Sequence, residues 1–217
     1  VLDAQSRFAY LFVGTTLSSL LAFFLNLFFA RSLSYQDYGI FASLMSLITL
    51  FTIPAQSLSS ILVRYATSFF ARNEFDRAGA LYIRPFKYLI VSSILFNIAF
   101  VLFSPIISNF LKINRFGLLF LVGATVAVFY VATLNLAFIQ SLLKFKLLGF
   151  IYAIAGVGKL AGGIILVLLG FSVYGAIFAT FIFSFLDFIF SLYPLRKVIK
   201  NAGKTVGIGT KAFSSYA

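Results

Sequence analysis

The chain has 217 residues, of which 62% are hydrophobic and 10% are charged, and its formal net charge is +12. This charged fraction is far below the roughly 25% of soluble domains, which excludes a water-soluble fold. With no cysteine, no histidine and five acidic residues, disulfides, Cys or His zinc sites and histidine bases are excluded, so we expect no enzyme, no catalytic residue, no bound metal and no cofactor.

Apolar stretches long enough to cross a membrane recur along the chain. A helix needs about 20 residues to cross a hydrocarbon core of about 30 Å. None of the stretches has the polar alternation of barrel strands. We therefore predict an all-α, polytopic integral membrane protein with six transmembrane helices, at residues 8–30, 40–62, 86–104, 117–139, 149–170 and 173–193.

The first two spans are joined by RSLSYQDYGIFASL, residues 31–44. Ser34 or Asp37 is expected to cap the second helix, because both side chains accept hydrogen bonds from free helix amides. Pro54 is expected to bend the second span without ending it. Pro85 is expected in the first turn of the third span, where its missing N–H does no harm.

Later connections divide the chain into a lobe and a tail. Residues 104–117 are predicted to form a short outer connection, and GFSVYG at 170–175 a tight outer hairpin. Residues 1–193 then form one six-helix lobe. After this lobe, apolar positions fall on one face and lysines on the other, so residues 194–217 are predicted to be a basic amphipathic linker at the membrane surface, or the start of a seventh helix.

The basic residues fall unevenly on the two predicted sides. With the amino terminus inside, 13 of the 17 lie in the cytoplasm, Arg31, Lys112 and Arg115 lie outside, and Lys159 lies within the fifth span. This positive-inside bias predicts a multi-pass protein of the cell (cytoplasmic, or inner) membrane with both termini of this segment cytoplasmic. We expect the loops to attract anionic membrane lipids, and we expect no nucleic-acid partner, since no aromatic-interleaved basic stripe exists.

Polar and aromatic side chains mark the spans and their ends. Asn26, Gln56, Asn97 and Asn135 are expected to form hydrogen bonds between helices or, less often, to contact a ligand. Because tryptophan is absent, tyrosines near span ends are expected to form the interfacial belt. These are Tyr10, Tyr35, Tyr38, Tyr82, Tyr88, Tyr174 and Tyr193.

Two stretches carry ordered motifs. The first is ARSLSYQDYGIFASLMSLITLFTIPAQSLSSILVRYAT, with Arg31, Leu33, Asp37, Tyr38, Gly39, Ser43, Leu44 and Arg64 as its marked positions. The second is residues 139–198, with Gln140, Lys144-Phe145-Lys146 and Val173-Tyr174-Gly175-Ala176. Together they resemble the first outer loop, the second helix and the fourth-to-sixth-helix region of the O-antigen-type polysaccharide-biosynthesis flippases, within the multidrug/oligosaccharidyl-lipid/polysaccharide exporter superfamily.

The resemblance implies a fold and a cargo. Such flippases have two six-helix lobes and move a polyprenyl-diphosphate-linked glycan across the membrane by alternating access. This chain has one lobe, so it is expected to be a fragment whose carboxy-terminal half is missing, or to pair with another copy. Two alternatives stay open: a multidrug/cation antiporter of the same superfamily, which an acidic cluster in the first helices would favour and spans one to five lack, and a non-transporting structural membrane subunit.

Lys159 is a charged residue in the middle of an otherwise apolar span. On insertion scales, an ammonium at the bilayer centre costs about 2.5–3.5 kcal/mol, so it is expected to face a cavity or a partner. GVGKL lacks the spacing of a phosphate-binding loop. Asp187 in the sixth span is about 6 Å less deep and within reach. The pair could lock two helices, or Lys159 could line a cavity for a diphosphate with Asp187 tuning it or binding a coupling cation, or Lys159 could snorkel.

The remaining candidates for substrate binding lie at span ends or mid-span. Arg64, at the inner end of the second helix, could snorkel to head groups or receive the diphosphate with its guanidinium fork. Arg31, at the outer end of the first span, could cap that helix or release the cargo. Gln56 lies within the second span. Gly158 and Gly162 flank Lys159 with the small-xxx-small spacing that lets another backbone approach.

Overall fold

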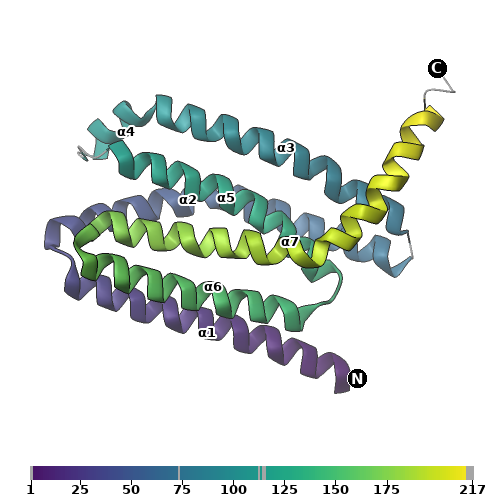
Figure 1. Ribbon diagram of the computed structural model, residues 1–217, viewed down its shortest axis with the longest axis horizontal. Helices are drawn as coiled ribbons and strands as arrows, with labels where there is room; N and C mark the ends of the chain where they lie inside the picture. Colours follow the sequence, from purple (N-terminus) through teal and green to yellow (C-terminus); the bar gives the residue numbers. More distant parts are fainter. Residues whose placement is uncertain (1, 73, 112, 114–115, 214–217) are drawn as a thin grey trace.

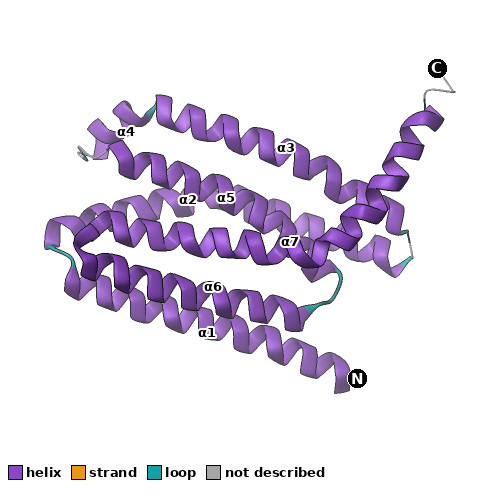
Figure 2. Ribbon diagram, in the orientation of Figure 1, coloured by secondary structure: helices purple, strands orange, loops and turns teal. Residues whose placement is uncertain are grey.

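The computed structural model describes residues 2–72, 74–111, 113 and 116–213, without the side chains of residues 2–8, 75, 76, 84, 116 and 196–213. Lys112, Arg115 and residues 214–217 of the predicted tail lie outside the described residues. Regular structure in the described part is entirely helical (Figure 2). The elements are α1 (Leu2–Ser32), α2 (Tyr35–Ala71), α3 (Phe75–Leu102), α4 (Ser104–Leu111), α5 (Phe116–Ser141), α6 (Phe145–Leu166), the π-turn η1 (Val167–Phe171) and α7 (Ser172–Phe213).

Within these described residues, five helical stretches are long and apolar enough to cross a membrane. The last of them, Phe145–Leu195, spans 51 residues because it contains a hairpin. The backbone reverses where Gly170 has φ +88° and Ser172 has φ +47°; the first of these values is readily adopted only by glycine. Divided at this turn, the stretch supplies α6 and α7. The prediction of an all-α, multi-pass membrane protein is confirmed, and the described residues form six long helices, α1, α2, α3, α5, α6 and α7.

The long helices run side by side, and their connections alternate between two ends of the bundle (Figure 1). The amino terminus and the connections after α2 and α5 lie at one end, and the connections after α1 and η1 lie at the other. We call these the amino-terminal end and the opposite end. α1 packs along α6, whereas α2 packs mainly on α5. Although α1 and α2 are consecutive in the chain, they therefore make little contact with each other. α7 lies between α5 and α6 and contacts both.

A buried polar network ties three helices together. The hydroxyl of Tyr82 in α3 donates a 2.8 Å hydrogen bond to Oδ1 of Asn135 in α5. The amide of Asn135 in turn donates a 3.0 Å bond to Oγ of Ser191 in α7. All three side chains are buried. This confirms the prediction that Asn135 joins helices, and it shows that Tyr82 was wrongly assigned to the interfacial belt.

The turn between α1 and α2 is fixed by short hydrogen bonds. Ser34 is the N-cap of α2, and its side chain accepts a 3.1 Å bond from the backbone N–H of Asp37. Asp37 itself accepts a 2.7 Å bond from the hydroxyl of Ser172, at the start of α7. Of the two predicted caps, Ser34 is therefore the one that acts. α2 then continues through Pro54 without a break, as predicted.

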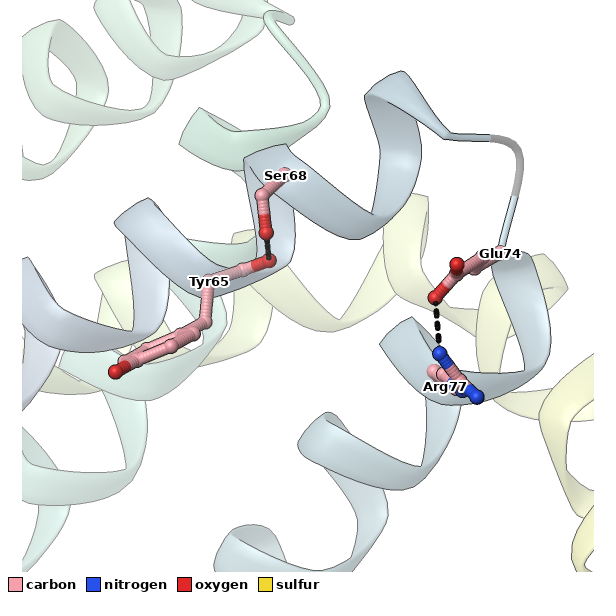
Figure 3. A network of polar contacts seen from close by, with 4 residues as sticks. All are labelled: Tyr65, Ser68, Glu74 and Arg77. Carbon is pink, nitrogen blue, oxygen red and sulfur yellow. Dashed lines mark hydrogen bonds and ion pairs between the residues drawn. The ribbon is translucent and has the colours of Figure 1, made fainter.

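At the amino-terminal end, α2 and α3 are joined by a turn whose polar contacts are local (Figure 3). Arg77 contacts Oε2 of Glu74 at 2.9 Å, and the hydroxyl of Ser68 donates a 2.8 Å bond to the carbonyl of Tyr65. The side chain of Arg77 is 70% exposed. An exposed pair of this kind contributes at most about 1 kcal/mol, so the turn is held mainly by its backbone.

One expectation about boundaries is wrong. Pro85 lies inside α3 and not in its first turn, since the helix already begins at Phe75. The outer connection contains a short helix, α4, whose amphipathic pattern allows it to pack on α5. After Pro194 the backbone of α7 stays helical to Phe213, and the surface role predicted for residues 194–217 stays a prediction.

Close packing between helices depends on glycines, but at the predicted pair the nearest neighbours are side chains and not a backbone. A Cβ on Gly14 would collide with the backbone of Gly149, and one on Gly149 with the carbonyl of Tyr10. α1 and α6 thus meet backbone to backbone. Gly158 and Gly162 instead face side chains of α7, not its backbone; a Cβ on Gly162 would lie 2.8 Å from a methyl group of Ile182.

Candidate functional site

Lys159 lines a cavity of about 200 Å³ between α1, α6 and α7. Its ammonium Nζ lies 5.4 Å from the centroid of the Phe183 ring. A cation over an aromatic face is stabilised by the ring's quadrupole, which partly replaces the hydration lost in the bundle. The cavity also contains Ser18 and Ser19 of α1, which supply hydroxyl groups near the charge. We call this space the Lys159 pocket.

The packing of α1 on α6 explains why the pocket exists. Gly156, one turn before Lys159, has no side chain, and a Cβ there would lie 2.9 Å from Oγ of Ser18. Because α1 can come this close, its serines reach the same space as the lysine. Sequence reasoning missed Ser18, Ser19 and Phe183. The run TTLSS at residues 15–19 is the signal that could have found the serines, since hydroxyl groups are unusual in so apolar a span.

Lys159 and Asp187 lie near one another along the hairpin but do not pair. Gly158 packs against Leu186, so the residues that follow them are within roughly one helical turn of the same level. Both side chains are described, and no ion pair within 4 Å joins them. The predicted ion pair that locks two helices is therefore wrong: the lysine turns toward Phe183 and α1 instead.

Asp187 is a buried carboxyl group without a full set of partners. The residue is 3% exposed, and within the described part of the chain its Oδ1 has no hydrogen-bond partner. An ionised carboxylate in such surroundings is strongly unfavourable unless a proton or a cation neutralises it. An orphaned polar atom inside a membrane bundle marks a functional candidate.

Gln56 and Arg64 lie on one exposed face of α2. Their spacing, with Ser60 midway, is that of successive turns, and all three residues are exposed. The opposite face of the helix is the buried one. The hydroxyls of Ser46, Ser57 and Ser60 donate to carbonyls four residues earlier, at 3.0, 3.3 and 3.1 Å. We call this the polar face of α2: Ser43, Ser46, Gln56, Ser57, Ser60 and Arg64.

Arg31, the remaining candidate, belongs neither to the hairpin with Lys159 and Asp187 nor to the polar face of α2. That residue is exposed in the last turn of α1, at the opposite end of the bundle. A cation in this position interacts favourably with the helix carboxyl terminus. The structure thus brings Lys159 and Asp187 to one hairpin and Gln56 and Arg64 to one helix face. Over the same described residues, His, Cys, Asp and Glu side chains form no group of three that could hold a metal ion.

Comparison with known proteins adds one match. The model of a family described as polysaccharide biosynthesis protein matches residues 28–213. Searches of curated proteins and of solved structures gave no match. The matched range covers most of the chain, including Lys159, Asp187 and the polar face of α2, and it begins after Ser18 and Ser19.

Proposed function

Because the chain belongs to the polysaccharide biosynthesis protein family and is a multi-pass membrane protein, we propose that it is one lobe of a flippase. The cargo is a polyprenyl-diphosphate-linked glycan, carried across the cytoplasmic membrane by alternating access. No covalent bond is made or broken, so the protein is not an enzyme. Movement between two lobes changes the leaflet to which the cargo site opens.

The unpaired charge of Lys159 is the observation that supports this function most. A diphosphate needs positive charge to enter an apolar bundle. The ammonium contacts an aromatic ring and lines an open pocket, so it can exchange that contact for a phosphate oxygen. An ion-paired lysine could do so only by breaking the pair, which is strongly unfavourable inside a bundle.

The polar face of α2 supplies the remainder of the proposed path. Gln56 and Arg64 are exposed, and contact between such polar side chains and lipid chains is energetically unfavourable. Charged and amide groups in the hydrocarbon region therefore turn toward water, cargo or another helix. Arg64 can receive the diphosphate at the cytoplasmic entrance through two parallel hydrogen bonds. Arg31, at the opposite end of the bundle, is proposed to contact the cargo as it leaves.

The charged residues suggest how the chain is oriented in the membrane and how transport is driven. The positive-inside rule puts both ends of this segment in the cytoplasm. Asp187, buried with one free oxygen, is the group that can take up a proton or a metal cation during the cycle. The second lobe comes from a carboxy-terminal half or from another copy of this chain.

The test is complementation of a glycan-flippase-deficient strain by the full-length reading frame. Wild type is compared with Lys159→Met, which removes the charge and keeps the length, and with Lys87→Met, which removes an exposed charge outside the site. All variants are matched for membrane expression. We expect surface glycan with wild type and Lys87→Met, and at least tenfold less with Lys159→Met. Equal rescue by all three would refute the role of Lys159. Efflux of cationic drugs without glycan export would favour the antiporter.

A further inference from the structure

A second and larger cavity lies on the outside of the bundle at its amino-terminal end. It measures about 800 Å³ and runs between α1 and the start of α6. Val13 and Leu17 of α1 form one wall, and Phe150 and Ala153 of α6 form the other. This volume is within the range of about 300–1,000 Å³ that is usual for small-molecule sites. We call it the α1–α6 groove.

Two lysines stand at one end of this apolar groove. Lys144 and Lys146 both line it and are both exposed. The ammonium of Lys146 lies 5.2 Å from the centroid of the Tyr10 ring, so part of the positive charge is held at the rim by a cation–π contact. The groove is therefore amphipathic along its length, with cations at the connection before α6 and apolar side chains farther into the span.

The groove is bordered by an apolar surface of α1. Val13, Leu17, Leu20 and Phe24 of α1 are 62%, 41%, 50% and 58% exposed, a spacing that places them on one side of the helix. Such a face is suited to lipid chains. The close contact of Gly14 with Gly149 leaves no side chains at that point, which gives the groove its depth.

We propose that the α1–α6 groove binds one anionic glycerophospholipid of the cytoplasmic leaflet. One acyl chain lies between Leu17 and Phe150, and the phosphate lies between Lys144 and Lys146. The assignment rests on the cytoplasmic orientation proposed above and on charge complementarity, because basic residues near a membrane surface attract anionic head groups. The cargo is a different lipid, and its diphosphate is placed at the Lys159 pocket.

The test measures lipid bound to full-length protein purified in detergent, by native mass spectrometry. The probes are palmitoyl-oleoyl phosphatidylglycerol, phosphatidylcholine with the same chains, and undecaprenyl phosphate. Lys144→Ala/Lys146→Ala is compared with Arg72→Ala/Lys87→Ala, which removes two exposed charges outside the groove. Lys144→Arg/Lys146→Arg keeps the charge, and Ala153→Phe fills the groove.

We expect the preference for phosphatidylglycerol over phosphatidylcholine to fall about five-fold for each groove lysine removed. It should persist in the arginine pair and in the control pair. Ala153→Phe should reduce binding of both phospholipids. Equal losses in the groove and control pairs would overturn the site, and tighter binding of undecaprenyl phosphate would make it a cargo site. Because no flipping is measured, failure here is distinct from failure of the proposed function.

Discussion

The hydroxyl of Tyr82 donates a 2.8 Å hydrogen bond to Oδ1 of Asn135 across the interface of α3 and α5. Both residues are buried, and the side-chain amide of Asn135 donates a second hydrogen bond to Ser191. Removing the donor leaves a buried acceptor unsatisfied, which costs about 1–3 kcal/mol. The network therefore provides the first measurable test of how the bundle is held together.

We expect Tyr82→Phe to lower the free energy of unfolding by about 1–3 kcal/mol. The measurement is denaturation of the full-length protein in detergent, followed by intrinsic fluorescence. Tyr88→Phe is the matched control, because Tyr88 is in the same helix and 76% exposed, and it should have no measurable effect. Similar losses in both variants would contradict the network.

We expect Gly149→Ala to destabilise the contact between α1 and α6. The new methyl group would collide with the carbonyl of Tyr10, and overpacking of this kind costs about 1–3 kcal/mol. Gly39→Ala is the control, since among the described residues nothing lies within 4 Å of its Cβ position; it should be neutral or stabilising by up to about 1 kcal/mol. The thermal midpoint of each variant reports the difference, and a fully stable Gly149→Ala protein would show that the two backbones do not meet.

We expect Lys159→Met to be at least as stable as wild type, although it fails to transport. No ion pair is lost, and the insertion cost of a mid-membrane charge, about 2.5–3.5 kcal/mol, is relieved. Thermal midpoints and surface glycan are measured on the same preparations. Lys87→Met, which removes an exposed charge outside the site, should change neither. A large loss of stability in Lys159→Met would return this residue to a structural role.

We expect Asp187→Asn to fold as stably as wild type, because the neutral amide replaces a carboxyl with one unpartnered oxygen. Transport by this variant should no longer respond to a change in the proton or sodium gradient. Asp37→Asn serves as the comparison: its carboxylate accepts a 2.7 Å bond from Ser172, and weakening this charge-assisted bond should cost about 1 kcal/mol. If Asp187→Asn unfolds while Asp37→Asn does not, Asp187 has a structural partner.

The parts of the fold that could be predicted from sequence are those decided by local composition. Hydropathy over about 20 residues is a property of each span alone, and the reversal at Gly170 and the cap at Ser34 depend on a few adjacent residues. Pro85 was misplaced because the charged residues before it lower the local hydropathy, although they belong to the same helix, which begins at Phe75. Its position is accommodated within a long helix, as Pro54 is.

What could not be predicted depends on which helices become neighbours. Nothing local shows that Gly14 will meet Gly149, or that Tyr82 will turn inward to Asn135 while Tyr88, six residues on, stays exposed. The same is true of Lys159. Its depth in the membrane could be predicted from its position in the span, but its neighbours could not. The packing of α7 on α6 decides that Phe183 lies beside the ammonium, and the packing of α1 on α6 decides that Ser18 lines the same pocket.

The bond from Ser172 to Asp37 has a mechanical consequence. It connects residues 135 positions apart and fastens the turn before α2 to the turn between α6 and α7. In the alternating-access cycle proposed above, we therefore expect these two connections to shift together, since moving one alone would break this bond between the start of α2 and the start of α7.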